Sequence, residues 1–343
     1  MVMATKPDAL AVDLPEAVWS AAVRTLEGAR TATLVCHVAP DGDALGSMLA
    51  LARVLRSRGT EVTCTWGDAT WAVPPSYRWL PDIDTVVAPS QVSREPEVLV
   101  VLDTASRDRL GVLGDVADAA HELVVIDHHA HNSGLSGVQL IDPAAAATAV
   151  LVEELVRRLA PSIDVDTATL LYVGLVTDTG SFQHPVTTPA VHAVAGRLLA
   201  DGADPSVIAR QLWGTRSFGF NTVLGAALSR LRLEEQAAAG RGWVWTWTTI
   251  DDLAKAGLAL DEIEPVIDVV RATREADVAA VFKQDGDGSF RVSTRSRGAT
   301  DVGAVCAALG GGGHKLAAGF TSYDDVDTTA ERLRAQLAGA PAP

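Results

Sequence analysis

Aspartate and histidine recur in four separate segments of the sequence, each at a point where an apolar run breaks into a turn. The segments are His37-x-x-x-Asp41-x-Asp43, Asp103, Asp127-His128-His129 and Asp178. The first three directly follow the runs TLVC, VLVVL and LVVI, which have the length and apolar content of buried parallel strands. Because the carboxyl ends of parallel strands meet at one edge of a sheet, we expect these side chains to converge there, where α/β proteins place their chemistry.

Carboxylates mixed with imidazoles are donors that suit Mn²⁺, Mg²⁺, Fe²⁺ or Co²⁺. Six candidate ligands exceed what a protein normally gives to one ion; they are His37, Asp41, Asp43, Asp103, His128 and Asp178. The leading interpretation is therefore a hydrolase with two metal ions.

Simpler explanations exist for some of these residues. Asp43 could cap a helix that begins near Ala44, and Asp103 and Asp178 could be ordinary turn residues. Those explanations leave His37 and Asp41 unaccounted for. Gly42 and Gly46 would permit sharp turns in this acidic loop.

The pattern of apolar runs predicts an α/β fold in two domains. Residues 1–200 should form a doubly wound, mainly parallel sheet, with strands at 31–36, 60–66, 98–102 and 123–126. A turn cluster at 201–205 opens a helical connector over residues 201–220. Residues 221–343 should form a smaller α/β domain, with strands at 242–249, 278–283 and 290–294.

Composition limits the partners of the chain. A formal charge of −15 argues against coating long nucleic acid, because such binding relies on many phosphate contacts by Lys and Arg. The apolar runs fall far short of the roughly 20 residues that a membrane span needs, and the N-terminal stretch lacks a signal-peptide core. We therefore expect a cytoplasmic protein with no membrane partner. Cys36, Cys64 and Cys306 are odd in number and widely spaced, which indicates reduced core thiols.

The segments HVAPDGDALGS, VLDTA, IDHH and VTDTGSF resemble, in order, the four motifs of the DHH phosphoesterase family. By motif position, the resemblance implies three pairs of metal ligands: His37 and Asp41 on one ion, Asp43 and His128 on the other, and Asp103 and Asp178 bridging both. Bridging carboxylates can hold two ions about 3.5–4 Å apart. Mn²⁺ is the favoured ion, with Mg²⁺, Co²⁺ or Fe²⁺ as alternatives.

The sequence Asp127-His128-His129 follows a buried strand, so we expect the two rings to point to opposite sides, one toward metal and one toward substrate. The resemblance implies that His129 contacts the scissile phosphate or helps the leaving oxygen. Asp127 would fix the histidine tautomer. Both are therefore predicted catalytic residues.

Near the end of the chain, GGGGHKLAAG resembles the DHHA1 domain that accompanies the DHH domain. Gly310–Gly313 would form either an ordinary surface loop or a flexible backbone that a phosphate could approach. On the strand before it, alternation places Phe290 and Val292 toward the core and Arg291, Ser293 and Arg295 on the other face. The resemblance implies that substrate is bound by Ser293, Arg295, Gly311, Gly312, Gly313, His314 and Lys315.

Trp243, Trp245 and Trp247 should share one face of a strand. They could stack on bases. The favoured interpretation is a core or subunit contact, because aromatic side chains dominate such surfaces.

The compact DHH plus DHHA1 arrangement resembles the NrnA group of this family. That resemblance implies hydrolysis of short RNA (nanoRNA), of pApA or cyclic di-AMP, and of 3′-phosphoadenosine 5′-phosphate (PAP), each yielding a 5′-mononucleotide, and it implies a homodimer. An inorganic pyrophosphatase or polyphosphatase with the same metal site is the alternative enzyme. A nucleotide sensor with purely structural metals is the alternative without catalysis.

Overall fold

The computed structural model describes residues 11–129 and 132–342. It divides into two compact units, Met1–Thr215 and Arg216–Pro343. The division falls inside the predicted connector, and the domain limits 1–200 and 221–343 stay a prediction.

The first unit is built on a five-stranded sheet in the order β2-β1-β3-β5-β7, in which every neighbouring pair is parallel. Its strands are β1 (Thr31–Cys36), β2 (Glu61–Trp66), β3 (Val98–Leu102), β5 (Glu122–Asp127) and β7 (Val138–Ile141). The short strands β4 (Ala105–Ser106) and β6 (Asn132–Ser133) form a separate pair.

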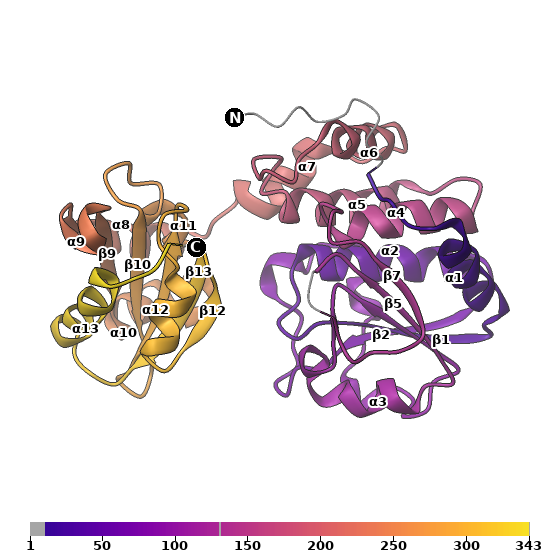
Figure 1. The fold of residues 1–343 in the computed structure, drawn as a ribbon, viewed down its shortest axis with the longest axis horizontal. Helices are drawn as coiled ribbons and strands as arrows, with labels where there is room; N and C mark the ends of the chain where they lie inside the picture. The colour runs from indigo at the N-terminus through magenta and orange to yellow at the C-terminus, as the bar shows by residue number, and fades with distance from the viewer. Residues whose placement is uncertain (1–10, 130–131, 343) are drawn as a thin grey trace. The chain divides into compact units, whose positions relative to one another are not determined.

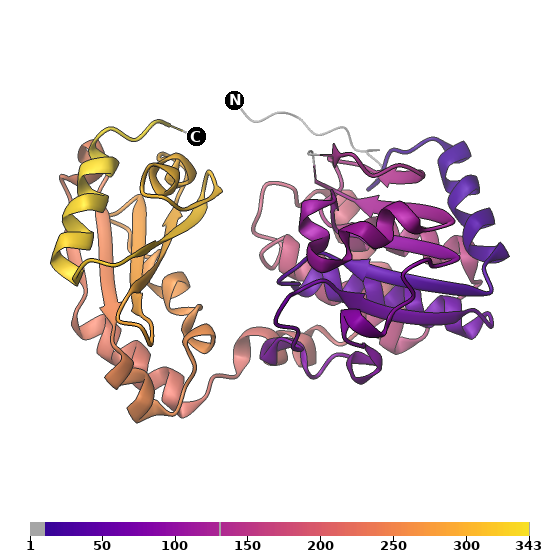
Figure 2. The ribbon, with the colours of Figure 1, turned by 90° about the horizontal axis from the view of Figure 1, so that it is seen from below.

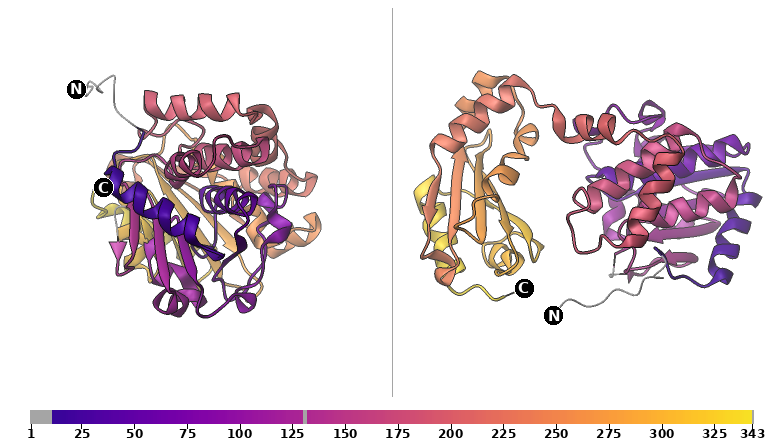
Figure 3. Two further views of the ribbon diagram at one scale, coloured as in Figure 1. Left: turned by 90° about the vertical axis from the view of Figure 1, so that its right-hand side faces the viewer. Right: turned by 90° about the horizontal axis from the view of Figure 1, so that it is seen from above.

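Alternate side chains of this sheet enter two separate apolar cores. On β3, Val100 and Leu102 join one core, and Leu99 and Val101 join the other. In Figure 1 helices lie on both sides of the sheet, and Figure 3 shows the same layers from the side. This arrangement confirms the predicted doubly wound α/β fold.

The helices of the first unit differ in which core they cover. The larger core contains residues of α1 (Glu16–Gly28), α2 (Gly42–Ser57), α4 (Thr148–Leu159), α5 (Val165–Asp178) and α6 (Pro189–Ala200), and the smaller contains residues of α3 (Gly114–Ala119) and the 3₁₀ turn η4 (Asp108–Leu113). The chain then continues through α7 (Pro205–Ala209) and the π-helical turn η5 (Arg210–Gly214). None of the described helices combines the length and apolar composition that a membrane crossing requires.

The second unit is a mixed six-stranded sheet in the order β12-β13-β11-β10-β9-β8, in which only β9 and β10 run parallel. Its strands are β8 (Arg232–Glu234), β9 (Trp243–Thr248), β10 (Val278–Gln284), β11 (Phe290–Ser296), β12 (Gly312–His314) and β13 (Ala317–Ser322). Its helices are α8 (Phe218–Ser229), α9 (Ala237–Gly240), α10 (Ile250–Ala256), α11 (Val266–Val270), α12 (Val302–Ala308) and α13 (Val326–Ala338), with the 3₁₀ turn η6 (Leu260–Ile263).

This second sheet also has a core on each face, but the two cores differ in extent. One core joins side chains from β9, β10, β11 and β13 to α12 and α13, and α13 runs along that side of the strands in Figure 2. The opposite core takes sheet residues only from β9 and β10, with α8, α10 and α11 over them. The same face of β11, β13 and β12 is therefore left outside both cores.

The three tryptophans of β9 belong to the protein interior. Trp243 and Trp245 are buried in the first of these cores, with their rings stacked 5.4 Å apart, and the half-buried Trp247 packs against it. The core interpretation is therefore confirmed, and burial leaves Trp243 and Trp245 no face on which a base could stack. Cys36, Cys64 and Cys306 are buried and free, as predicted.

Candidate metal centre

Three neighbouring strands bring the Asp and His segments together. His37 directly follows β1, Asp103 directly follows β3, and Asp127 is the last residue of β5. The register pairs Cys36 with Leu102, and Leu102 with Ile126, so the three strands end side by side. This confirms the predicted convergence at the carboxyl edge of the parallel sheet.

The start of α2 supplies two more carboxylates, in roles that differ from the sequence expectation. Asp41 is the N-cap, and its Oδ1 accepts hydrogen bonds from the backbone N–H groups of Asp43 (3.0 Å) and Ala44 (3.1 Å). Asp43 lies inside the first turn and is fully buried. Capping therefore explains Asp41 and not Asp43.

The N-terminus of α4 holds the Asp43 carboxylate in place. One oxygen accepts from the backbone N–H of Thr148 (2.6 Å), and the other accepts from Ala149 N–H (2.8 Å) and the Ser47 hydroxyl (3.0 Å). A helix N-terminus favours negative charge, which offsets part of the cost of burying this group. Thr148 and Ser47 were not found from the sequence; the only signal for Thr148 was a short polar side chain after four alanines, at a helix start.

Gly42 and Gly46 lie within α2 and do not form turns, contrary to the expectation. A Cβ on Gly42 would lie 2.5 Å from Thr177, and one on Gly46 would lie 2.4 Å from the Leu170 carbonyl oxygen. Both residues thus let α5 pack closely against α2. This contact carries Asp178, the last residue of α5, to the metal centre.

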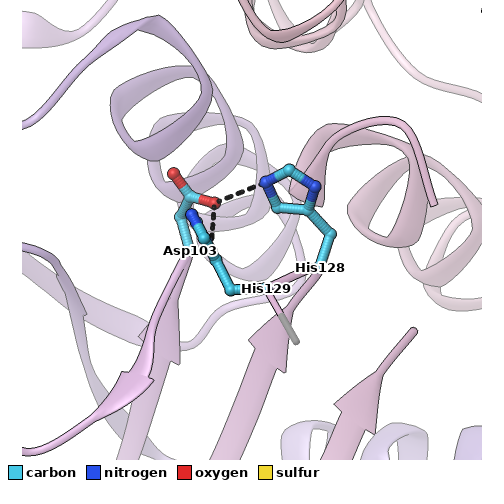
Figure 4. Close-up of side chains that lie close together, drawn as sticks. All are labelled: Asp103, His128 and His129. Carbon is cyan, nitrogen blue, oxygen red and sulfur yellow. Dashed lines mark ion pairs between the residues drawn. The ribbon is translucent and has the colours of Figure 1, made fainter. Parts of the chain in front are cut away.

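The Asp103 carboxylate faces both His128 and His129 (Figure 4). Asp103 is 1% exposed and has a φ of 61°, a left-handed conformation that Asp tolerates better than most residues. Its Oδ1 accepts from the Thr148 hydroxyl (2.9 Å), and its Oδ2 lies 3.3 Å from His37 Nε2. Burial, reinforced by the carboxylates of Asp41 and Asp178, raises the pKa of Asp103 to about 8.

The two adjacent histidines approach the same carboxylate and do not point to opposite sides. His128 Nε2 lies 3.5 Å and His129 Nδ1 lies 3.8 Å from Asp103 Oδ1, with the rings edge-on and 4.6 Å apart. The expectation was wrong because the strand ends at Asp127, so the alternation of extended chain no longer applies. Asp127 Oδ1 accepts from His129 Nδ1 (2.7 Å) and from the His129 backbone N–H (3.0 Å).

The donor atoms form overlapping groups that would suit cations. Burial would lower the pKa of His128, but the Asp178 carboxylate 3.0 Å from its Nε2, with other carboxylates, raises it to about 10. Among the described residues, the buried Nε2 atoms of His37 and His128 have no hydrogen-bond partner of good geometry. Atoms within 4.8 Å of one another define three groups: His37, Asp41 and Asp103; Asp43, His128 and Asp178; and Asp103, His128 and His129.

Clustered carboxylates, and imidazole nitrogens that face them without a hydrogen bond of good geometry, are donors that suit divalent cations. The first two groups are separate, and Asp103 connects the first with the third. All six residues predicted as ligands thus lie together, in an arrangement that fits two ions.

The second unit brings several predicted substrate residues onto one surface. Strand pairing sets Arg295 beside Ala317, and Ala317 beside His314; the next row is Ser293, Gly319 and Gly312. Because directly paired residues share a face, these six residues form one surface, here named the open face. It belongs to the part of the sheet that neither core covers. In its second row only Ser293 has a side chain, because the other two residues are glycines.

The glycine run is more ordered than the flexible loop expected from the sequence, because Gly312–His314 forms the edge strand β12. A Cβ on Gly311 would lie 2.1 Å from the Gly319 carbonyl oxygen, and one on Gly313, whose φ is +140°, would lie 2.6 Å from Ala317 O. Packing against β13 therefore explains these two glycines. Lys315 is exposed just beyond the strand, and its carbonyl accepts from Val302 N–H (2.9 Å).

Comparisons with known proteins agree with this geometry. The model of the DHH family N-terminal domain matches residues 31–175, and that of the DHHA1 domain matches residues 248–339. The bifunctional oligoribonuclease and PAP phosphatase NrnA of Thermus thermophilus is 33% identical over 303 residues, which cover 88% of this chain and 87% of the relative. NrnA of Bacillus subtilis is 28% identical over 312 residues, covering 89% and 94%.

Among solved structures, an exopolyphosphatase-related protein from Bacteroides fragilis shares the fold, with a TM-score of 0.86 at 23% identity over 94% of this chain and 96% of that one. The two domain models, the NrnA relatives and the six converging side chains agree. The chain belongs to the DHH family of phosphoesterases, with a DHH domain followed by a DHHA1 domain.

Proposed function

We propose that this protein is a two-metal phosphoesterase that hydrolyses short oligoribonucleotides, pApA and 3′-phosphoadenosine 5′-phosphate to 5′-mononucleotides, with cyclic di-AMP as a further candidate substrate. The observation that carries the proposal is the convergence of six Asp and His side chains at one sheet edge. The similarity to NrnA proteins supports the choice of substrates.

The ligands would divide as the motifs imply, with His37 and Asp41 on one ion, Asp43 and His128 on the other, and Asp103 and Asp178 between them. Two divalent cations, Mn²⁺ in first place, would supply a nucleophile at neutral pH and neutralise charge on the phosphoryl oxygens. The Asp43 carboxylate is fixed by the α4 N-terminus, so its position would not depend on bound cations.

His129 would act on the scissile phosphate, and Asp127 would orient it. The hydrogen bond from His129 Nδ1 to Asp127 Oδ1 leaves Nε2 as the ring atom that can face a ligand. When the ring is charged, Nε2–H can donate to a phosphoryl or leaving oxygen, and the buried Asp127 carboxylate stabilises that charge. Asp127 is thus a positioning residue in this proposal.

The open face would bind the nucleotide. Arg295 can pair two phosphate oxygens at once, and Ser293 and His314 can add hydrogen bonds. Gly312 belongs to this face, and Gly311, Gly313 and Lys315, its neighbours along the chain, would complete the binding site with backbone groups and an exposed ammonium. The net charge of −15 supports short substrates, because a long polyanion would need an extended basic track.

A side-by-side comparison of kcat/KM with Mn²⁺ tests the proposal. The substrates are pApA, cyclic di-AMP, 3′-phosphoadenosine 5′-phosphate, inorganic pyrophosphate and RNAs of two to twenty nucleotides. We expect pApA and the shortest RNAs to rank first and pyrophosphate last. A preference for pyrophosphate would assign the chain to the alternative enzyme, and no turnover of any substrate would favour a sensor.

A further inference from the structure

One lysine of the second unit is buried within a strand. Lys283 lies on β10 with 2% of its surface exposed. Its strand partner is Arg291 on β11, so its side chain shares the sheet face of Arg291, Ser293 and Arg295. Two and four residues earlier on the same strand, Val281 and Ala279 enter the core beneath α11. Lys283 therefore lies where that core gives way to the polar side chains of β11.

The Lys283 ammonium is held by two groups. It donates to the Glu264 carboxylate and, at 2.9 Å, to the hydroxyl of Ser293. The Ser293 hydroxyl in turn lies 3.4 Å from the second Glu264 oxygen, which closes a triangle. Burial lowers the pKa of Lys283, the Glu264 carboxylate opposes this, and the charges of Arg295 and Arg291 lower it further.

The two members of the Lys283–Glu264 ion pair differ in their exposure to solvent. Lys283 is buried, whereas the Glu264 side chain is 51% exposed and comes from the segment between η6 and α11. Arg291 has a carboxylate of its own, since its Nε donates to Asp285 at 2.8 Å. Glu264 is therefore the anion that compensates a buried cation beside Ser293, and it can move into solvent without disturbing the strands.

A ligand phosphate at Ser293 and Arg295 would meet both charges of this pair. The ammonium would attract it, and the Glu264 carboxylate would repel it at the same short range. If the Glu264 carboxylate moves away into solvent, the repulsion is removed and the phosphate takes its place beside the ammonium. The buried Lys283 cation then has an anionic partner both before and after the phosphate binds. This exchange requires no charge to be left unpaired in the protein interior.

We propose that Lys283 is a phosphate-binding residue of the open face and that Glu264 is its exchangeable counter-ion, displaced when a nucleotide phosphate binds. This rests on the proposed function of the open face as the nucleotide site. Ser293 connects the two, because its hydroxyl contacts Lys283 before the exchange and can donate to the phosphate after it.

Binding of 5′-AMP and of adenosine to the full-length protein in EDTA, measured by calorimetry, tests this proposal without catalysis. Lys283→Met should weaken 5′-AMP binding roughly tenfold or more, the loss expected for a charge-assisted hydrogen bond. Adenosine, which lacks the phosphate, should bind both proteins equally. Glu264→Gln should bind 5′-AMP more tightly than the wild type, because the competing carboxylate is gone. Lys255→Met is the matched control, since Lys255 makes an exposed ion pair with Asp251 in the same unit.

Unchanged 5′-AMP affinity in Lys283→Met would overturn the proposal. So would a Glu264→Gln variant that binds as weakly as Lys283→Met, since the pair would then be purely structural. If thermal melting shows that Lys283→Met does not fold, the Glu264→Gln result decides alone: tighter binding supports the exchange, and equal or weaker binding overturns it. A wild-type protein that neither binds 5′-AMP nor hydrolyses pApA would instead overturn the proposed function, and this inference with it.

Discussion

Replacing Asp103 with asparagine should separate what this carboxylate does for catalysis from what it does for folding. Asn tolerates the left-handed backbone at this position, where φ is 61°. Its amide oxygen can still accept from the Thr148 hydroxyl, and its NH₂ group can donate to His37 Nε2, now 3.3 Å from the second oxygen. Asp103→Asn therefore removes a charge while leaving the local packing unchanged.

The size of the effect on stability follows from the pKa of Asp103, which burial raises from an ordinary value of 3.8 to about 8 in the metal-free protein. A carboxyl whose pKa is raised on folding stabilises the fold fully only below pH 3.8, and this contribution is lost as the pH rises to about 8. At about 1.4 kcal/mol per pKa unit, the loss has a ceiling of roughly 5–6 kcal/mol. It is a ceiling because neighbouring carboxylates also take up protons.

Thermal unfolding and turnover together provide the assay. In EDTA at pH 8, Asp103→Asn should melt several degrees above the wild type, since each kcal/mol shifts Tm by roughly 2–4 °C for a unit of this size. The difference should shrink toward pH 5. Addition of Mn²⁺ should raise the Tm of the wild type but not that of Asp103→Asn. With Mn²⁺, the kcat of Asp103→Asn should be lower than that of the wild type by orders of magnitude.

Asp142→Asn is the control for removing a buried carboxylate outside the cluster. Asp142 is 7% exposed and accepts from Asp13 N–H and Ala144 N–H, each at 2.9 Å. This variant should keep its activity and its stabilisation by Mn²⁺. The reasoning is refuted if Asp103→Asn retains near-normal kcat with Mn²⁺, or if it is less stable than the wild type in EDTA at pH 8.

Three further predictions concern the second unit and the substrate. Arg295→Ala and His314→Ala should each raise KM, by the equivalent of about 1.5–3 kcal/mol for a lost phosphate contact, without changing metal content; metal depletion in elemental analysis would place the residue in the metal centre instead. For 5′-phosphorylated RNAs, kcat/KM should fall steeply from the dinucleotide to beyond about five nucleotides, and equal values for a two-mer and a twenty-mer would contradict this. Gly313→Ala should lower Tm because its Cβ would clash with β13, whereas Gly312→Ala, with open space around it, should not; equal melting temperatures would show that packing does not explain Gly313.

The sheet edge could be predicted from the sequence because each strand carries its own signal. The residues directly before His37, Asp103 and Asp127 are LVC, VLVVL and LVVI, which are apolar throughout, as is typical of strands buried on both faces. Parallel strands that begin at one edge end at the other, so convergence follows without knowledge of any contact. A different argument, the alternation of side chains along a strand, predicted which side chains of β11 lie outside the core.

Contacts made between helices carry no comparable signal. Glycines in an acidic segment, such as Gly42 and Gly46, suggest a turn from the sequence. Only the packing of α5 on α2 shows that they make room for a neighbouring helix. The contacts of Thr148 with Asp43 and Asp103 join residues 105 and 45 positions apart, which no local pattern records. Thr148 thus helps to position the metal centre without belonging to any of its motifs, and Gly42 and Gly46 belong to the first motif for a packing reason that the motif does not reveal.

The alternation of side chains explains both a correct and a wrong prediction, and the difference lies in the hydrogen-bonded ladder. Trp243 and Trp245 belong to β9, where pairing with β10 enforces the pleat, and their rings share one face as predicted. His128 and His129 follow the last paired residue of β5, where nothing enforces it, and both rings turn toward Asp103. Just beyond the end of a strand the backbone is free to direct neighbouring side chains to one point, as it does for these two histidines. Strand patterns in the sequence therefore locate such a site, but the alternation of side chains does not predict how the residues beyond the strand end are oriented.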